Sequence, residues 1–284
     1  MGKFDGILIC TDLDGTLLNQ NSQLSDETTN IINNFISNGG YFTYATARSH
    51  NSASVITNKL NLNLPVITFN GAFIYDYSKK EYLHKVLFSD EQVKSLYNIV
   101  TNKNCTPLVY TFVNGVEKVL WYDNPTLSDG ARYYLSNRKN DKRMTPVSSI
   151  DESFCGDIFY ITFIDNKEKV LPVYETANTI KDFNVLYQQE LYRTEYWCEI
   201  MPKMASKSNA LTLLKNMLGC NRVVAFGDSL NDIPMFNIAD ECYAVKNAKK
   251  ELKEIATQVI DYNYNDSVAL KIKELEYWGR KWKH

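Results

Sequence analysis

The sequence has no long hydrophobic run and no block of like charges. No stretch of about 18 apolar residues, the length that crosses a bilayer, is present, and no basic segment followed by an apolar one stands near the N-terminus. The formal net charge of −2 provides no attraction to nucleic acid or to an anionic membrane. We therefore expect a cytoplasmic protein whose partner is a small molecule and neither nucleic acid nor a membrane.

Histidine is scarce, and cysteine has no regular spacing. Only three histidines occur, too few for a mechanism built on several of them, and none accompanies cysteines at a zinc-binding spacing. The six cysteines include no C-x-x-C pair. In a chain of this length without a secretory leader, we expect them to be reduced and mostly buried.

The two ends of the chain share one pattern of apolar segments. A chain of 284 residues exceeds the size at which a single core usually stops growing, so two unequal domains are expected. Near both ends, strands alternate with helices, as in parallel βαβ units. The expected strands lie at 5–10, 41–45, 65–69 and 223–226. The expected helices begin near Asp26, Ser52 and Lys207.

The middle of the chain has a different pattern. Strands expected at 108–113 and 116–122 flank Asn114-Gly115, the dipeptide preferred in a two-residue type I′ hairpin. Further strands are expected at 158–164, 183–187 and 195–201, with a helix at 167–180. Strands joined by short turns indicate antiparallel pairing, which favours an α+β insertion.

These patterns together predict the fold class. We expect an α/β protein with a Rossmann-like parallel sheet and helices on both of its faces. Residues 1–85 and 202–284 would form this discontinuous core, and residues 86–201 would form an inserted α+β domain. We expect a monomer or a small homo-oligomer.

Two aspartates, Asp12 and Asp14, follow the first predicted strand in the stretch DLDGT. Side chains alternate along an extended segment, so both should point the same way, at the carboxyl end of a parallel strand where open α/β sheets bind ligands. Gly15 permits a sharp turn with positive φ. The same letters are also typical of an ordinary turn.

A second acidic cluster, GDSLND, ends at Asp232. Asp228 stands just past the strand at 223–226, and Asn231 and Asp232 follow within one helical turn. If this strand pairs with the first one, four aspartates converge on one crevice. Carboxylates about 4 Å apart repel by roughly 4 kcal/mol at an effective dielectric constant of about 20, so such a group requires a cation. Oxygen ligands of this kind favour Mg²⁺, although GDSLND alone also resembles a capped helix start.

A magnesium site rich in aspartate commonly serves phosphoryl transfer, in which charge accumulates on the oxygens of the transferred group. Thr46, at the end of the second predicted strand, offers a hydroxyl and an N–H to a phosphate oxygen. Lys207 opens a helix just after the insertion and offers a positive charge. Taken singly, Thr46 is typical of a turn or helix cap and Lys207 of a solvated surface.

These stretches together resemble a known family. The stretch DLDGT, Thr46-Ala47-Arg48, Lys207 and GDSLND occur in the order of the four motifs of the haloacid dehalogenase (HAD) superfamily. The insertion is similar to the large α/β cap of Cof-like, type IIB phosphatases. The resemblance spans the whole chain, and its first and fourth motifs are the specific ones.

The resemblance implies a role for each acidic residue. Asp12 would be the nucleophile that forms an aspartyl-phosphate. Asp14 would protonate the leaving alcohol and then activate water, and its backbone carbonyl would be a Mg²⁺ ligand. Asp12 and Asp228 would bind the metal directly. Asn231 and Asp232 would complete or support the metal shell.

The resemblance also implies the phosphate site. Thr46 and Lys207 would neutralise the transferred phosphoryl group, with Lys207 oriented by the fourth motif. Arg48 and Asn70 match positions near the family's substrate entrance, although a surface salt bridge and a plain turn are equally typical of them.

Two positions depart from the family pattern. Ala47 and Ser208 replace glycines that the family usually has, and neither residue favours a positive φ.

The function that follows is a Mg²⁺-dependent phosphatase for small phosphorylated metabolites, such as sugar phosphates or similar compounds. The cap would select the substrate. Two alternatives stay open: a phosphomutase of the phosphomannomutase type, and a non-catalytic protein that binds a phosphorylated ligand.

Overall fold

The computed structural model describes residues 6–103, 105–190 and 193–279. The chain divides into two compact units. The core unit comprises Met1–Lys85 and Ser206–His284, and the cap unit comprises Val86–Ala205.

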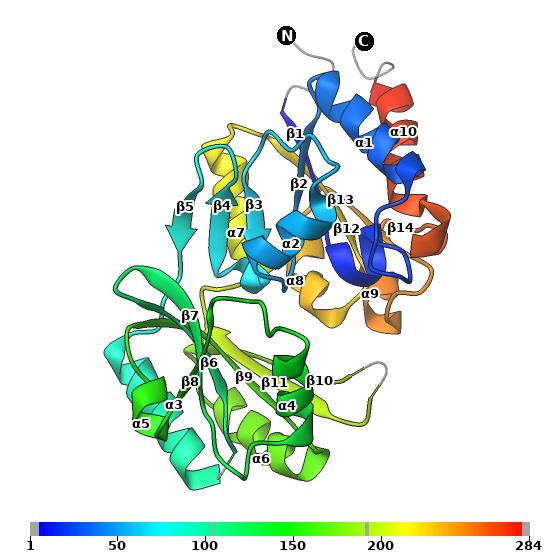
Figure 1. Cartoon of the computed structure of the whole chain (residues 1–284). Coiled ribbons are helices and arrows are strands. Elements are labelled where there is room, and N and C mark those ends of the chain that lie inside the picture. Colours follow the sequence, from blue (N-terminus) through cyan, green and yellow to red (C-terminus); the bar gives the residue numbers. More distant parts are fainter. Residues whose placement is uncertain (1–5, 104, 191–192, 280–284) are drawn as a thin grey trace. The chain divides into compact units, whose positions relative to one another are not determined.

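The core unit contains a parallel sheet with the strand order β14-β13-β12-β1-β2 (Figure 1). Its strands are β1 (Ile7–Thr11), β2 (Tyr41–Tyr44), β12 (Arg222–Gly227), β13 (Glu241–Ala244) and β14 (Gln258–Val259). β1 lies between β12 and β2, with Cys10 opposite Ala225. The condition under which the two acidic clusters would meet, pairing of the first strand with the strand at 223–226, is therefore fulfilled. Asp5, which the sequence pattern included in the first strand, lies outside the described residues.

Helices cover both faces of this parallel sheet. They are α1 (Asp26–Ser37), α2 (His50–Thr57), α7 (Lys207–Met217), α8 (Ile233–Phe236), α9 (Lys250–Ile255) and α10 (Ser267–Gly279). α1 packs against α10, and α7 packs against α8. Figure 1 shows α7 and α10 on opposite sides of the strands. The α/β fold with helices on both faces is confirmed. β1, β2, β12 and β13 are mostly buried because both faces are covered, whereas the edge strand β14 is exposed.

The third predicted strand differs from the expectation. β3 (Val66–Thr68) pairs antiparallel with β4 (Phe73–Asp76), which pairs antiparallel with β5 (Glu81–Lys85) in a separate sheet. A single parallel bridge from Ala45 to Ile67 is its link to the end of β2. The third predicted strand is therefore present and parallel to the end of β2, but it is joined to β2 by one bridge and forms a separate antiparallel sheet with β4 and β5.

Serine caps determine where two helices begin. The Ser25 side chain accepts a hydrogen bond from the Thr28 N–H, and α1 starts at the next residue. The Ser206 side chain accepts from the Asn209 N–H in the same way. Such caps satisfy N–H groups that have no partner within the helix. As a result, Lys207 is the first residue of α7.

The cap unit contains one sheet with the order β10-β11-β9-β6-β7-β8. Its strands are β6 (Leu108–Val113), β7 (Val116–Tyr122), β8 (Met144–Val147), β9 (Asp157–Asp165), β10 (Phe183–Gln189) and β11 (Tyr196–Pro202). All neighbours pair antiparallel except β7 and β8, which are parallel. Asn114 and Gly115 both have positive φ, so the predicted hairpin turn is confirmed.

The helices of the cap unit are α3 (Asp90–Lys103), α4 (Asp129–Ser136), α5 (Ile150–Ser153) and α6 (Lys167–Asn178). α3 and α6 pack together over one face of the sheet, where Val109, Phe163 and Cys198 are buried. The sequence patterns predicted the helix at 167–180, which corresponds to α6, but neither α4, α5 nor β8.

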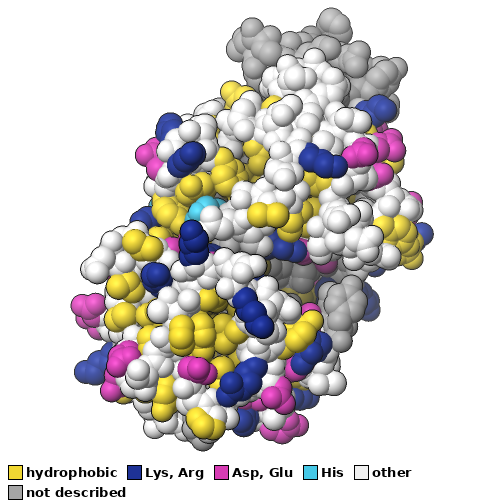
Figure 2. Space-filling view, in the orientation of Figure 1, with side chains coloured by type: hydrophobic (Ala, Val, Ile, Leu, Met, Phe, Trp, Pro, Cys, Tyr) yellow, Lys and Arg dark blue, Asp and Glu magenta, His cyan; other side chains and the backbone are white. Residues whose placement is uncertain are grey.

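The surface carries no single dominant charge. Figure 2 shows basic and acidic side chains interspersed over the drawn face, with hydrophobic ones between them. Within residues 6–103, 105–190 and 193–279, no helix has the length and hydropathy of a membrane span. Five of the six cysteines are buried, and Cys155 is exposed.

Candidate active site

The backbone brings two acidic segments together where β1 and β12 end. The Asp12 N–H donates to the Phe226 carbonyl at 3.0 Å, which continues the β1–β12 ladder by one residue. Gly15 then turns the chain with φ of 80°. A Cβ at Gly15 would lie 2.6 Å from Oδ2 of Asp228, so the turn can approach Asp228 only because the residue is glycine.

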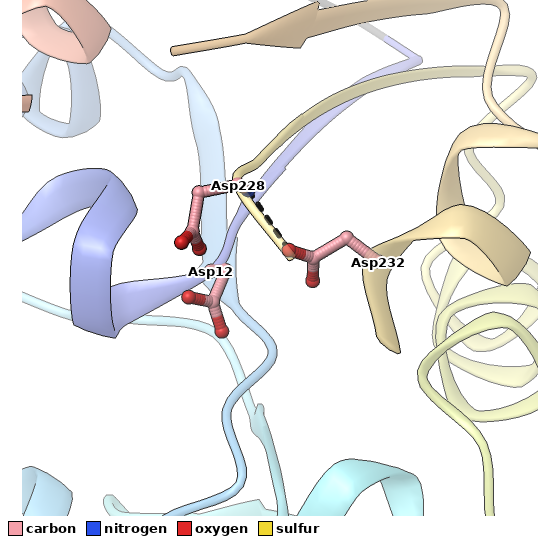
Figure 3. A group of neighbouring side chains, drawn as sticks. All are labelled: Asp12, Asp228 and Asp232. Atoms are coloured by element: carbon pink, nitrogen blue, oxygen red, sulfur yellow. Dashed lines mark hydrogen bonds between the residues drawn. The ribbon is translucent and has the colours of Figure 1, made fainter. Parts of the chain in front are cut away.

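Three carboxylates form one group at this point. Asp12, Asp228 and Asp232 each have an oxygen within 4.8 Å of the others (Figure 3). Figure 3 shows Asp12 and Asp228 side by side, with Asp232 facing them from the turn after β12. Asp12 and Asp232 are buried and Asp228 is partly buried. The two predicted clusters therefore meet in space, although not with all four aspartates.

Lys207 lies inside this acidic group. Its Nζ donates to Oδ1 of Asp12 at 2.5 Å and to Oδ1 of Asp232 at 2.7 Å. The residue is only 2% exposed. Burial lowers the pKa of Lys207, but the attraction of Asp12 and Asp232 outweighs burial and raises it, so the ammonium stays charged. Lys207 is thus a fixed buried cation, and not the solvated surface lysine that is typical of its residue type.

The acids remain under-neutralised despite this lysine. Burial raises the pKa of Asp12 well above its usual range, against the opposing effect of Lys207. Burial and the nearby Asp232 raise the pKa of Asp228 to about 7. Both raised pKa values indicate that a further positive charge nearby would stabilise the ionised carboxylates of Asp12 and Asp228.

Asp232 has little capacity left for another ligand. Its Oδ1 accepts from Lys207, while its Oδ2 accepts from the N–H groups of Asp228 and Ser229, each at 3.0 Å. Gly227 lies against it, since a Cβ there would come within 2.7 Å of Asp232. These contacts make Asp232 the residue that holds Lys207 and the Asp228 backbone in place.

Asp14 does not join the other three acids. Its side chain is 46% exposed and forms a two-point ion pair with Arg48, with Nε to Oδ2 at 2.6 Å and Nη2 to Oδ1 at 2.5 Å. β1 ends at Thr11, and a turn over Leu13–Leu17 follows. This turn breaks the alternation of side chains on which the prediction for Asp12 and Asp14 was based. The expectation that Asp12 and Asp14 point the same way into one cluster of four is therefore wrong for the carboxylate of Asp14.

Thr46 and Asn70 belong to two loops that are hydrogen-bonded to each other. The Asn70 N–H donates to the Thr46 carbonyl at 2.9 Å, and the Phe69 N–H donates to the Arg48 carbonyl at 3.0 Å. Thr46 is 1% exposed, and its hydroxyl accepts from the Arg48 N–H at 3.1 Å. Phe69, Asn70 and Gly71 all have positive φ, so this loop is held in an unusual conformation.

Asn231 joins the fourth motif to this loop. Its Nδ2 donates to Oδ1 of Asn70 at 3.0 Å. Its own Oδ1 is buried and accepts no hydrogen bond from any residue that the structure describes. A buried acceptor without a partner is costly, so it marks a place for a donor or a cation.

Thr16 is a site residue that the sequence patterns did not single out. Its hydroxyl donates to Oδ1 of Asp228 at 2.9 Å across 212 positions of sequence. The DLDGT stretch contained this threonine, but its role becomes visible only when β12 is placed beside β1. Thr16 fixes one oxygen of Asp228 and leaves the other available.

The donor set fits a hard divalent cation. Its carboxylates, the unpartnered Oδ1 of Asn231 and the raised pKa of Asp12 and of Asp228 are the features expected of an oxygen-ligand site for Mg²⁺. Ala47 and Ser208, the two departures from the glycines of the resembled family, do not have positive φ, so they impose no backbone strain.

Comparison with known proteins identifies the same family that the sequence motifs resemble. The profile of the haloacid dehalogenase-like hydrolases matches residues 9–272. Two 5-amino-6-(5-phospho-D-ribitylamino)uracil phosphatases of Bacillus subtilis are similar: one is 27% identical, covering 94% of this chain and 96% of the relative. The other is 29% identical, covering 94% and 97%. A haloacid dehalogenase-like hydrolase structure from Bacteroides thetaiotaomicron matches with a TM-score of 0.77 at 22% identity, covering 94% of this chain and 98% of the other.

Proposed function

Because this chain belongs to the haloacid dehalogenase-like hydrolase family, we propose that it is a Mg²⁺-dependent phosphatase that uses Asp12 as its nucleophile. Its substrates are small phosphorylated metabolites, such as sugar phosphates or related compounds. The observation that carries this proposal is the contact of Lys207 with Asp12 and Asp232, beside Asp228 at the carboxyl ends of β1 and β12.

The first step forms a bond between a carboxylate oxygen of Asp12 and phosphorus. The bond from phosphorus to the alcohol oxygen breaks, and Asp14 supplies the proton to that oxygen. Lys207 holds Oδ1 of Asp12, which leaves Oδ2 as the attacking atom. The ammonium of Lys207 and the hydroxyl and N–H of Thr46 offset charge on the phosphoryl oxygens.

The second step returns Asp12 to its free form. Water attacks phosphorus, its proton passes to Asp14, and the bond from phosphorus to Asp12 breaks as inorganic phosphate leaves. For both steps Asp14 must leave its ion pair with Arg48, because in that pair both of its oxygens accept hydrogen bonds from the guanidinium.

Asp12 and Asp228 are the residues that would hold Mg²⁺, together with the backbone carbonyl of Asp14. The ion would supply positive charge where the phosphoryl oxygens gather. Asp232 supports this group through Lys207 and the Asp228 N–H.

The substrate class rests on the relatives and on charge. The relatives from Bacillus subtilis are named for a phosphorylated ribitylaminouracil, a small phosphate monoester. A net charge of −2 gives this chain no general attraction to polyanions. Both observations support a small monoester as substrate.

The decisive experiment measures phosphate release from a panel of phosphorylated metabolites with Mg²⁺ present. Asp12→Asn should lower the rate by at least about a thousandfold, because the amide is a poor nucleophile. Asp157→Asn, which changes an exposed aspartate of the cap unit, is the matched control and should retain the wild-type rate. Equal rates for wild type and Asp12→Asn would refute the role of Asp12.

A second measurement addresses the metal. Activity should disappear in excess chelator and return when Mg²⁺ is restored, whereas full activity in chelator would exclude the proposed dependence. Isomerisation of a sugar phosphate without net release of phosphate would instead identify a mutase.

A further inference from the structure

A short segment after β13 is hydrogen-bonded to both acidic turns of the core unit. This bridging segment, residues 245–249, lies between β13 and α9. The Val245 N–H donates to the Gly227 carbonyl at 3.3 Å, and the Lys249 N–H donates to the Asp228 carbonyl at 2.8 Å. Two backbone hydrogen bonds therefore attach the bridging segment to the turn after β12.

The side chain of Asn247 extends from this segment to the other acidic turn, which follows β1. Its Nδ2 donates to the Gly15 carbonyl at 2.8 Å, across 232 positions of sequence. Its Oδ1 accepts from the Asn263 N–H at 3.1 Å. One end of the side chain must donate and the other must accept, which an amide does and a carboxylate does not. Both ends of the amide are thus engaged, although the residue is exposed.

Asn263 holds a second point of the turn after β1. It is buried, and its Nδ2 donates to the Leu18 carbonyl at 2.7 Å. Within the turn, the Leu18 N–H donates to the Leu13 carbonyl at 2.9 Å. Asn247 and Asn263 therefore anchor the turn from outside, at the carbonyls of Gly15 and Leu18.

The position of Gly15 matters because Gly15 lies beside Asp228. A Cβ on Gly15 would be 2.6 Å from Oδ2 of Asp228. The next residue, Thr16, donates to Oδ1 of Asp228 at 2.9 Å. In the proposed function Asp228 binds Mg²⁺ together with the backbone carbonyl of Asp14, the residue before Gly15. A shift of Gly15 would therefore change the spacing of two proposed metal ligands.

Glycine gives the turn little stiffness of its own. Gly15 has φ of 80°, and without a side chain its two backbone dihedral angles are less restricted than those of other residues. The hydrogen bond from Asn247 to the Gly15 carbonyl limits this freedom before an ion arrives. Ligands that are fixed in advance bind more tightly, because less conformational entropy is lost on binding.

From these contacts we propose that Asn247 is a positioning residue that prepares the Mg²⁺ site. It holds the Gly15 carbonyl so that the Asp14 carbonyl and Asp228 keep the spacing that the ion requires. Asn247 acts through the turn and is not itself a metal ligand. This inference rests on the proposed function, since it concerns the same ion.

Calorimetric titration of the full chain with Mg²⁺, after treatment with chelator, measures the effect. Asn247→Leu keeps a side chain of similar shape and removes both hydrogen bonds. It should weaken Mg²⁺ binding by at least about tenfold, as is usual when a residue that orients a metal ligand is removed. Asn265→Leu is the matched control. It removes a similar bond, from Nδ2 to Asp261 at 2.8 Å, that involves neither acidic turn, so Mg²⁺ should bind as it does to wild type.

Two further readouts distinguish positioning from a general loss of structure. The urea midpoint of Asn247→Leu in chelator should stay close to that of wild type, because hydrogen bonds of an exposed side chain contribute little net stability. In phosphate assays the variant should need at least about tenfold more Mg²⁺ for its half-maximal rate, and should approach the wild-type rate when Mg²⁺ is saturating.

Equal Mg²⁺ affinity of wild type and Asn247→Leu would overturn this inference alone. A large fall in the urea midpoint, with a low rate at saturating Mg²⁺, would also overturn it, because it would show that Asn247 maintains the fold in general. Failure of the wild-type chain to bind Mg²⁺ would overturn the proposed function as well.

Discussion

At the scale of single residues, Lys207 determines how the acidic group can exist in a folded protein. It neutralises part of the charge of Asp12 and Asp232, both of which are buried. Removing one partner of a buried ion pair leaves uncompensated charge, which costs more than the pair itself contributes. We therefore expect the lysine to be needed for folding as well as for the proposed phosphate binding.

Lys207→Met should show both effects. We expect the rate of phosphate release to fall at least about a hundredfold and the free energy of unfolding at pH 8 to fall by about 3 kcal/mol. Phosphate assays and urea denaturation measure the two quantities. Lys215→Met on the same helix should change neither, and a Lys207→Met protein with normal activity would contradict the proposed role.

The pKa of Asp228 predicts how the metal-free protein responds to pH. The pKa rises from 3.8 to about 7 on folding, so the folded state binds more protons than the unfolded state between these values. The stabilising effect of this proton is complete below about pH 4 and is lost as pH rises through about 7. In chelator, wild type should therefore lose stability over this range.

Asp228→Asn removes the group that titrates. In chelator at pH 8 it should be more stable than wild type, by up to about 4 kcal/mol, and the difference should shrink towards pH 5. Urea denaturation at several pH values measures this. A constant difference across the range would contradict the pKa shift as its cause.

The sequence located the site residues better than it oriented them. Spacing placed Asp12 and Asp228 at the ends of two predicted strands, but their meeting depended on the condition that these strands are neighbours, which the structure meets. The direction of Asp14 depended on one glycine turn and on Arg48, which the chain supplies from another loop. Thr16 was overlooked for the same reason, because its partner is distant in sequence.

At the scale of elements, the loop at Gly71 positions the start of α7. A Cβ on Gly71 would collide with the carbonyl of Ser206, the residue before Lys207. Gly71 also has φ of 97°, which other residues rarely adopt. The loop after β3 therefore lies directly against Ser206, the residue that caps α7, the helix that begins with Lys207.

Gly71→Ala should lower the free energy of unfolding by about 3 kcal/mol and reduce phosphate release, because the clash displaces the backbone beside Lys207. Gly39→Ala is the matched control. Gly39 also has positive φ, of 84°, but no atom lies within 4 Å of its added Cβ, so a loss of only about 1 kcal/mol is expected. Thermal unfolding and phosphate assays compare the two. Equal effects would show that the loop does not position α7.

The elements that the sequence patterns failed to predict are short, have few buried apolar residues or contain proline or glycine. α5 has only four residues, and α9 has one buried apolar side chain, Leu252. β8 includes Pro146, which is tolerated because β8 is an edge strand. α4 contains Gly130, which disfavours a helix until packing against Ile164 of β9 and against Glu195 compensates. Long periodic segments were predictable, and short ones depended on tertiary contacts.

At the scale of the whole molecule, the two units have separate hydrophobic cores. If Mg²⁺ binds at Asp12 and Asp228, it should slow amide hydrogen exchange in β1 and β12 and leave β6 and β9 unchanged. Exchange monitored by mass spectrometry, with and without Mg²⁺, tests this. Protection confined to the cap unit would place the ion elsewhere.

The pairing of β1 with β12 also constrains when the enzyme becomes active during its synthesis. A ribosome completes the DLDGT stretch early, and the cap unit, whose sheet is contiguous in sequence, can fold next. At that stage β1, which precedes Asp12, can pair with β2 but still lacks its second neighbour, β12. A nascent chain that stops after the cap thus lacks the proposed catalytic centre, so we expect no phosphate release until translation has passed Asp232.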